Sequence, residues 1–492
     1  MVLVATKMDH LETKKYISII GFLVIVLCLF PEMDGATAAW LNHGADISNT
    51  RSAKGDVRIN RLTVKNLRLK WTFFAVNAFD GALIWKQNLS QITGLSGTGI
   101  VVNVTVSRST PTIADDLLLV GIYGPAVVIA LTRASGRLVW STQLDPRPRA
   151  QITQSGTFYN GAFYVGVSSL EVGLPANQCC TFRGSMAKLD GRTGTTMWRT
   201  YTLPDNQGKL GGYSGAAIWG SSPAIDVARG LVYVGTGNLY TAPREVTQCQ
   251  EAQNNQTEKP TQPDQCIGPD IHFDSILAIN IDTGRIKWAR QLGGYDIFGE
   301  APMLLTIVAN RTRRDVAVAV QKSGFAFALD RDTGSIVWSK LAGPGGLEGG
   351  GTWGAATDGR TVYTNIVNSN GERFTLAPAN QTTTAGAWVA LDANSGQILW
   401  STANPSNETA HGPVTIVNDV LFAGSVAPNG PIYAMDAKTG NILWSYNTGA
   451  TVYGGVSAGH GCIYLGNGYS IGLARFHPTW TGGTSLYAFC NI

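Results

Sequence analysis

The chain has 492 residues, of which 14% are charged, 44% are hydrophobic and 58 are glycine, and its formal net charge is +4. Few charges and many turn-forming residues are typical of a large all-β protein built from short strands. The small net charge, without long runs of like charges, argues against binding to nucleic acid or to an anionic membrane surface.

The N-terminal residues carry the pattern of an export signal. Two lysines precede an apolar run at 19–30, and small residues follow at 36–38. A basic end, a short apolar core and an A-x-A cleavage site predict a secretory signal peptide, which we place at residues 1–38. A membrane anchor is the alternative, but the run is shorter than the roughly 20 residues that a spanning helix needs. We therefore expect residues 39–492 to form one secreted, extracellular domain without a membrane span.

The cysteines and the glycosylation sequons agree with export. Of the 7 cysteines, only Cys28 lies in the signal, so an even number remains, which favours disulfides over a metal site. Asn-x-Ser/Thr sequons predict a glycoprotein in a secreted chain, and they stand at Asn88, Asn103, Asn255, Asn310, Asn380 and Asn407.

A repeat of the form A-x-D-x-x-T-G-x-x-x-W runs through the chain. In each copy an apolar strand ends in Asp or Asn, the D-x-x-T-G stretch turns, and a second strand carries the tryptophan, which predicts a hairpin. The glycine supplies the positive φ of the turn, and the tryptophan is core packing between neighbouring units. Complete or weaker copies end at Trp85, Trp140, Trp198, Trp288, Trp338, Trp400 and Trp444.

Such units cannot bury their apolar faces alone, so they stack, and a closed ring removes the sheet edges. Trp71 has the strand of a repeat without its hairpin, and the last residues have a hairpin's first strand without a tryptophan. Trp71 and Trp85 are only 14 residues apart, whereas a four-stranded blade needs roughly 40. We therefore expect an all-β, eight-bladed β-propeller. Its first blade is truncated to a hairpin near residues 72–90, and its last blade is closed by pairing 67–73 with 485–490.

Beyond the repeats, several short motifs carry a family resemblance. They stand at residues 40–44 (WLNHG), 179–184 (CCTFRG), 219–223 (WGSSP), 235–238 (GTGN) and 349–354 (GGGTWG). Together they resemble the quinoprotein alcohol dehydrogenases, most closely the polyvinyl-alcohol dehydrogenase-like branch, from Trp40 to the end. The resemblance implies a quinoprotein-type propeller with pyrroloquinoline quinone (PQQ) on its axis beside a calcium ion. It also implies oxidation of an alcohol by hydride transfer to the quinone.

The resemblance also implies ligands for the calcium ion. Glu171 and Asn238 match the glutamate and the asparagine ligand, and Asp296 is the candidate for the third ligand and the catalytic base. Each has a simpler interpretation: Glu171 and Asp296 as ordinary loop carboxylates, and Asn238 as a turn residue after a strand.

Other positions match residues that contact the cofactor. Trp219 matches the tryptophan that stacks on the quinone, and Arg108 the arginine that pairs with a cofactor carboxylate. Lys322 holds the place of the basic catalytic residue that faces the quinone oxygen. The simpler interpretations are core packing for Trp219 and surface cations for Arg108 and Lys322. The remaining matches are hydroxyl contacts and a vicinal disulfide over the other ring face, at Thr153, Ser168, Cys179 and Cys180.

Two apparent deletions separate the chain from this pattern, at the first blade and at residues 295–302. They leave two functions open. The first is an extracellular PQQ- and calcium-dependent dehydrogenase that oxidises a small or polymeric alcohol and passes electrons to an external acceptor. The second is a non-catalytic propeller that binds a protein or a cell-wall glycan. We further expect disulfides Cys249–Cys266 and Cys462–Cys490, and a vicinal pair Cys179–Cys180.

Overall fold

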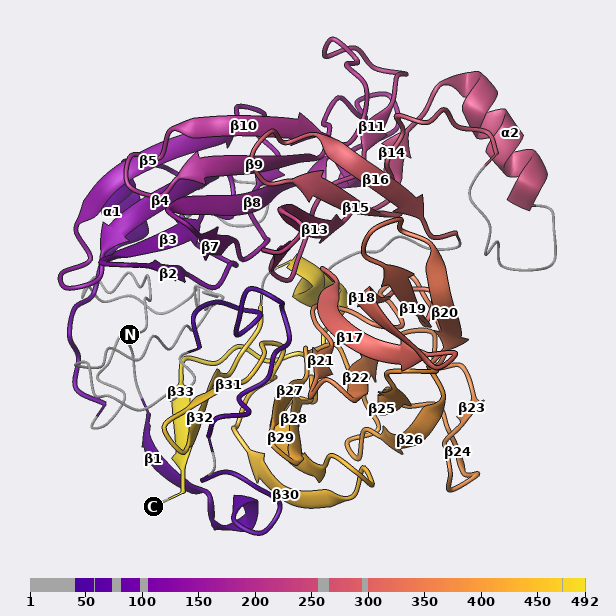
Figure 1. Ribbon diagram of the computed structural model, residues 1–492. Helices are drawn as coiled ribbons and strands as arrows, with labels where there is room; N and C mark the ends of the chain where they lie inside the picture. The colour runs from indigo at the N-terminus through magenta and orange to yellow at the C-terminus, as the bar shows by residue number, and fades with distance from the viewer. Residues whose placement is uncertain are drawn as a thin grey trace.

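The computed structural model describes residues 40–56, 58–72, 81–97, 105–254, 265–293, 300–470 and 472–491. Within these residues the chain is almost entirely β, and its sheets follow one another around a central axis as the blades of a propeller (Figure 1). None of the helices in the described residues is long and apolar enough to span a membrane.

Six four-stranded sheets and one five-stranded sheet, all antiparallel, make up the blades in the described residues. The first three comprise β2 (Thr112–Ala114), β3 (Leu117–Gly121), β4 (Ala126–Thr132) and β5 (Leu138–Asp145); β6 (Ala150–Gln151), β7 (Thr157–Tyr159), β8 (Ala162–Ser169), β9 (Ser185–Asp190) and β10 (Thr196–Tyr201); β12 (Ala224–Asp226), β13 (Leu231–Gly235), β15 (Ser275–Asn280) and β16 (Ile286–Gln291).

The next three blades continue around the ring in chain order. They comprise β17 (Met303–Ala309), β18 (Thr312–Val320), β19 (Phe325–Asp330) and β20 (Ile336–Leu341); β21 (Ala356–Thr357), β22 (Thr361–Ile366), β25 (Ala387–Asp392) and β26 (Ile398–Ala403); β27 (Thr415–Val417), β28 (Val420–Gly424), β29 (Pro431–Asp436) and β30 (Ile442–Asn447).

The last blade joins the two ends of the chain, as the sequence predicts. It comprises β31 (Ser457–Gly459), β32 (Cys462–Gly466) and β33 (Leu486–Cys490) with β1 (Arg68–Thr72) on its outer edge. In the antiparallel register, Arg68 pairs with Cys490 and Thr72 with Tyr487. The eight-blade count is not confirmed: the described residues form seven blade sheets, and residues 73–80 of the predicted hairpin remnant lie outside them.

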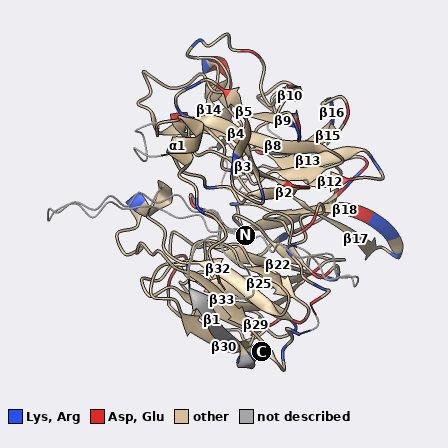
Figure 2. Cartoon of the chain, turned by 90° about the vertical axis from the view of Figure 1, so that its left-hand side faces the viewer, with Lys and Arg blue, Asp and Glu red and all other residues tan. Residues whose placement is uncertain are grey.

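Smaller elements lie on the loops. They are the pairs β11 (Ser214–Gly215) with β14 (Leu239–Thr241) and β23 (Phe374–Thr375) with β24 (Thr382–Thr383), the helices α1 (Leu89–Thr93) and α2 (Arg244–Asn254), and the 3-10 turns η1 (Val64–Asn66), η2 (Leu170–Gly173) and η3 (Gly472–Phe476). Charged residues lie mainly in turns and hairpin tips, such as the end of β17 and β18, and the sheets carry few (Figure 2).

The repeat motif forms the predicted hairpin and also joins each blade to the next. In one copy the Asp330 carboxylate accepts hydrogen bonds from the Thr333 amide and hydroxyl, both at 3.0 Å. Gly334 at the end of this turn has φ 70°. Trp288 of the preceding blade donates from Nε1 to the Arg331 carbonyl at 3.0 Å and lies against Gly334. The same tryptophan-to-turn bond recurs from Trp85, Trp140, Trp198, Trp338 and Trp400.

The core lies between successive blades. One cluster joins Val128 of β4 with Phe163 and Val165 of β8, and another joins Val318 of β18 with Val389 of β25. The alternation of half-buried and exposed residues on the outer strands, as along β5, reflects one face packed on a neighbour and one face in solvent.

All three predicted disulfides are confirmed. Their Cα separations are 3.1 Å for Cys179–Cys180, 5.7 Å for Cys249–Cys266 and 4.0 Å for Cys462–Cys490. The last of these joins paired residues of β32 and β33 in the blade that closes the ring.

Candidate functional site

The up-and-down order of each blade separates its loops into two sets. The repeat turns, which join the third and fourth strands of a blade, lie at one end of the ring. The loops that join the second and third strands lie at the other end, together with the loops between blades. Most predicted site residues of the described chain fall on this second set: Arg108 and Trp219 between blades, and Glu171, Cys179, Cys180, Asn238 and Lys322 between second and third strands. Ser168 lies near the end of β8, which pairs there with β6, and Thr153 follows β6. Topology therefore gathers most of the predicted site residues at one end.

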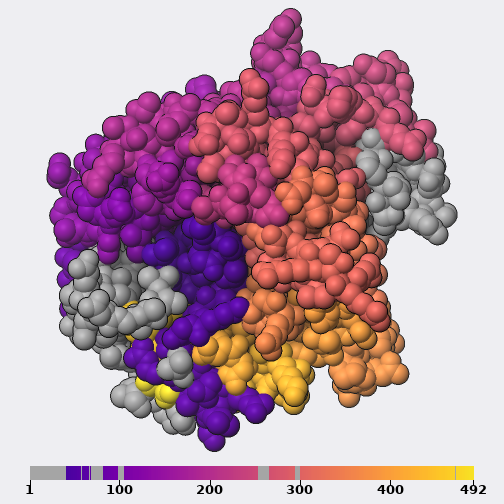
Figure 3. All heavy atoms as spheres, in the orientation of Figure 1, coloured from indigo at the N-terminus to yellow at the C-terminus, as the bar shows by residue number. Residues whose placement is uncertain are grey.

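A cavity of about 130 Å³ opens among these loops. Its wall includes Arg108, Thr153, Ser221, Trp353, Tyr453 and Tyr469. The N-terminal segment also contributes to the wall with Trp40, His43 and Arg51, and the indigo part of the chain lies across the middle of the face in Figure 3. Two of the predicted cofactor contacts, Arg108 and Thr153, thus share one cavity.

Arg108 is a cation set among aromatic rings. Its guanidinium carbon lies 5.2 Å from the ring centre of Tyr123 and 5.5 Å from those of Trp353 and Tyr469. Burial acts to lower the pKa of this guanidinium, but the phenol oxygens of Tyr469, Tyr123 and Tyr453 outweigh burial and raise the pKa. No carboxylate of the described residues forms an ion pair with it. The cavity therefore offers a permanent positive charge to a ligand.

Thr153, Ser168 and Trp219 form one hydrogen-bonded group beside the cavity. The Thr153 and Ser168 hydroxyl oxygens lie 2.9 Å apart, and the Thr153 hydroxyl donates to the Trp219 carbonyl. The Trp219 side chain is only 5% exposed and belongs to the core between blades. A Cβ on Gly237 would lie 3.2 Å from this indole, so the glycine lets the chain pass the ring closely before Asn238. The three residues are joined by hydrogen bonds, but the indole is not part of the cavity wall.

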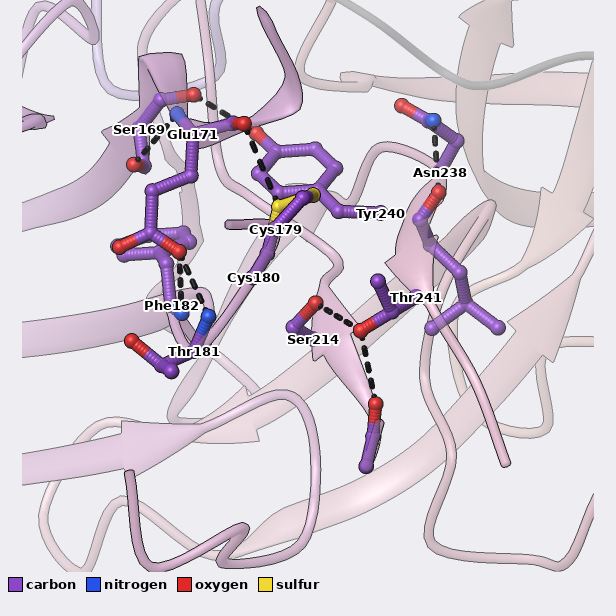
Figure 4. The surroundings of a disulfide bond; sticks show 12 residues. Ser169, Glu171, Cys179, Cys180, Thr181, Phe182, Ser214, Asn238, Tyr240 and Thr241 are labelled. Carbon is purple, nitrogen blue, oxygen red and sulfur yellow. Dashed lines mark hydrogen bonds between the residues drawn. A yellow bond between two sulfur atoms is a disulfide. The ribbon is translucent and has the colours of Figure 1, made fainter. Parts of the chain in front are cut away.

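The two predicted calcium ligands, Glu171 and Asn238, each form hydrogen bonds with nearby backbone groups. Glu171 accepts hydrogen bonds at Oε2 from the amides of Thr181, at 2.7 Å, and Phe182, at 2.9 Å. The Asn238 amide nitrogen instead donates to the Leu239 carbonyl at 2.9 Å. In Figure 4 the Glu171 carboxylate and the Asn238 amide lie on opposite sides of the vicinal disulfide.

The loop that carries the vicinal disulfide packs against Glu171. It folds back on η2, so that the Cys180 Sγ lies 3.3 Å from the Glu171 carbonyl oxygen and two backbone amides donate to Oε2 of the Glu171 carboxylate. The third predicted ligand and base, Asp296, lies outside the described residues. Hydrogen bonds engage Oε2 of Glu171 and the side-chain nitrogen of Asn238, so calcium binding by the two residues stays a prediction.

Lys322 lies under a glycine-rich loop. Its carbonyl accepts from the amides of Gly346, at 3.2 Å, and Gly350, at 2.7 Å, and the residue is 7% exposed. A Cβ on Gly350 would lie 2.3 Å from the Gly324 Cα, so only glycine allows this close approach. Lys322 is not part of the cavity wall.

Comparisons with known proteins support the family resemblance. A family model described as glucose/ethanol/alcohol dehydrogenase, beta-propeller domain, matches residues 176–340, and one described as outer membrane protein assembly factor BamB matches residues 60–200 and 328–471. A polyvinylalcohol dehydrogenase from Pseudomonas sp is 27% identical over 89% of this chain and 75% of its own length. A second, from Sphingopyxis sp., is 27% identical over 84% of this chain and 64% of its own length. The chain belongs to the PQQ alcohol dehydrogenase-like family, in the polyvinyl-alcohol dehydrogenase-like branch.

Solved structures support the propeller fold of this quinoprotein. Quinohemoprotein alcohol dehydrogenase from Comamonas testosteroni matches with a TM-score of 0.68 and 19% identity, over 92% of this chain and 80% of that one. The related enzyme from Pseudomonas putida HK5 matches with a TM-score of 0.73 and 18% identity, over the same shares. At this level of identity the match establishes the fold.

The quinoprotein also has a buried polar group that the sequence did not reveal. Arg51 is 1% exposed and donates from Nε to the Val414 carbonyl at 2.8 Å. Burial lowers the pKa of Arg51 to about 9, and burial and Arg51 lower the pKa of His43 to about 3. Burial raises the pKa of nearby Glu300 to about 8. These side chains come from distant loops, and no local pattern marks their contact.

A second polar cluster joins Glu348, His411 and His477. The three residues lie on loops of different blades, and each is a single polar residue in its own segment, so no spacing in the sequence indicates the cluster.

Proposed function

We propose that this protein is a PQQ-dependent dehydrogenase that oxidises an alcohol in the cavity containing Arg108. The observation that carries the proposal is the positive charge of Arg108 in this cavity, without a carboxylate partner in the described residues. A charged group held away from bulk water is costly unless a ligand or neighbour compensates it. A planar anion with several carboxylates is such a ligand.

The cavity wall suits an aromatic carboxylate of this kind. Arg108 would pair with a carboxylate through its planar fork, the Ser155 hydroxyl would donate a hydrogen bond, and the Thr153 hydroxyl oxygen would be an acceptor. Trp353 and Tyr453 would present apolar ring surface to the cofactor. When bound, PQQ supplies a quinone that accepts hydride from the alcohol.

The reaction's other participants are an alcohol, small or polymeric, and an external electron acceptor. The relatives named as alcohol and polyvinylalcohol dehydrogenases support this class of substrate. The predicted signal peptide supports an extracellular site of action. We assign calcium no step in this proposal.

The test is cofactor binding followed by turnover. Purified residues 39–492 should quench or shift the absorbance of added PQQ and then reduce an artificial dye in the presence of an alcohol, with calcium present or omitted. Arg108→Met removes the charge, and because hydrogen bonds to charged groups contribute about 1.5–3 kcal/mol, PQQ affinity should fall about 10- to 100-fold. Arg192→Met, at an exposed arginine, is the matched control and should bind normally.

A protein that folds but does not bind PQQ would contradict the proposal. The second candidate, a non-catalytic propeller that binds a protein or a cell-wall glycan, would then be favoured. One observation favours this candidate: the cavity volume of about 130 Å³ is below the roughly 300 Å³ usual for ligand pockets.

A further inference from the structure

Three loops from separate blades bring two histidines and a glutamate together. Glu348 follows β20, His411 precedes β27, and His477 follows η3 in the loop between β32 and β33. One ligand atom from each residue lies within 4.8 Å of the others. Among the described residues, this is the one group of three or more histidine, cysteine and carboxylate side chains with this geometry.

The side chains face one another through the atoms that bind metals. The Glu348 Oε2 lies 2.9 Å from Nε2 of His411 and 2.8 Å from Nε2 of His477. The His411 side chain is 0% exposed, Glu348 15% and His477 22%. The cluster is therefore enclosed on one side and open to water on the other.

Neighbouring groups hold both imidazoles in place. His411 Nδ1 lies 2.8 Å from the Thr409 hydroxyl, and Trp480 stacks on the His477 ring with centres 4.2 Å apart and planes at 7°. When Nδ1 donates to Thr409, Nε2 carries a lone pair that points at the cluster. Metal-binding histidines commonly have such a partner on their other nitrogen.

We propose that Glu348, His411 and His477 bind a divalent transition-metal ion of the zinc class. Two imidazole nitrogens and one carboxylate are a usual zinc ligand set, with water in the fourth position. Calcium and magnesium take oxygen ligands and do not suit two imidazoles. Zinc bonds of about 2.0–2.1 Å place neighbouring ligand atoms about 3.3 Å apart, so each glutamate–histidine pair needs to open by only about 0.5 Å.

The ion would stabilise the wall of the cavity. His411 lies 6.0 Å from the Tyr453 ring, which stacks on Tyr469 at 4.1 Å. Both tyrosines line the cavity. The metal would thus fasten three loops directly behind this wall. The proposal does not depend on PQQ, because none of the three ligands lines the cavity.

The alternative is a hydrogen-bonded cluster in which both Nε2 atoms donate to Glu348. Glu348→Gln keeps an oxygen acceptor for these bonds but removes the charge that a metal needs. His477→Gln removes the more exposed imidazole. Thr409→Val leaves all three ligands and removes only the orienting hydroxyl. His272→Gln, at a histidine outside the cluster, is the matched control.

The experiment uses protein without a histidine tag, freed of metal by chelation and kept without PQQ. Zinc chloride is titrated calorimetrically, and zinc content is measured by mass spectrometry. We expect about one zinc per chain in wild type and in His272→Gln, with a rise in Tm on zinc addition. Zinc affinity should fall about 10- to 100-fold in Thr409→Val, and further in Glu348→Gln and His477→Gln.

Two results would overturn the assignment. One is the absence of saturable zinc binding in folded wild-type protein. The other is zinc binding that is unchanged in both Glu348→Gln and His477→Gln, which would place the ion elsewhere. Circular dichroism of each variant shows whether it has folded, and a variant that has not is set aside in favour of Thr409→Val, whose hydroxyl does not contact the ion.

Discussion

At the scale of single residues, Glu300 is a carboxyl group that the fold keeps out of water. It is 2% exposed, its Oε1 accepts from the Ala355 amide at 3.2 Å, and its Oε2 has no hydrogen bond within the described residues. Burial raises its pKa to about 8, although the Ala355 and Val320 amides and Arg51 act in the opposite direction. At neutral pH the folded protein therefore holds a proton that the unfolded chain releases.

The titration of Glu300 makes the free energy of unfolding of the protein depend on pH. Between an unfolded pKa of 4.5 and a folded pKa of about 8, the native state binds more protons than the unfolded state, so the free energy of unfolding falls as pH rises. Glu300→Gln removes this titration. We expect urea unfolding at pH 5, 6.5 and 8 to show that the free energy of unfolding of the variant, relative to that of wild type, increases at each step. Parallel curves for the two proteins would contradict the raised pKa.

At the scale of the hairpin, the repeat motif couples turn geometry to packing. Gly396 ends one turn with φ 72°, and a Cβ there would lie 2.6 Å from Cε3 of Trp338 in the preceding blade. The same tryptophan donates to the Ala393 carbonyl of that turn at 3.0 Å. The glycine is therefore required twice, once by the backbone conformation and once by the indole.

Another glycine, Gly371, meets only the first of these two requirements. Gly371 has φ 62°, and a Cβ there would meet nothing within 4 Å. Gly371→Ala should lower the free energy of unfolding only by the cost of placing alanine in a left-handed backbone conformation, about 1–2 kcal/mol. Gly396→Ala should cost about 1–3 kcal/mol more, because the new methyl collides with the indole. Denaturant unfolding measures both, and equal losses would show that Trp338 does not contact this turn.

A double variant tests the contact itself. In a Trp338→Ala background the collision disappears, so Gly396→Ala should then cost about as much as Gly371→Ala. An unchanged cost of Gly396→Ala in that background would contradict the packing explanation.

At the scale of the whole molecule, the ring depends on joining its two ends. β1 from the N-terminal side completes the blade formed by β31, β32 and β33, and the Cys462–Cys490 disulfide joins two strands of this blade. The Cys249–Cys266 disulfide instead begins on α2, which projects from the ring in Figure 1. The two bonds close segments of similar size, 28 and 17 residues.

This contrast predicts different effects on global unfolding. Replacing Cys462 and Cys490 by alanine should lower the free energy of unfolding by about 2–4 kcal/mol, because the unfolded chain alone gains freedom. Replacing Cys249 and Cys266 should change it little, since the segment lies outside the blades. Similar losses in both variants, measured by thermal unfolding without reductant, would show that position in the ring does not matter.

The sequence alone determined the repeating hairpin, its turn chemistry, the joining of both chain ends and the disulfide pairs. Each of these depends on residues a few positions apart or on a pattern repeated in every blade, so local physics is sufficient. The family resemblance singled out Arg108 and Thr153, which both line the cavity.

The tertiary structure alone decided which loop side chains meet. The two amides that donate to the Glu171 carboxylate come from the disulfide loop, 10 and 11 residues further along the chain. Glu348 and His411 are 63 residues apart along the chain, and His411 and His477 are 66 residues apart. Only the arrangement of the blades around the ring brings their loops together. Loop ends are set by the conformation of whole segments and by the closure of the ring, neither of which a local residue pattern encodes.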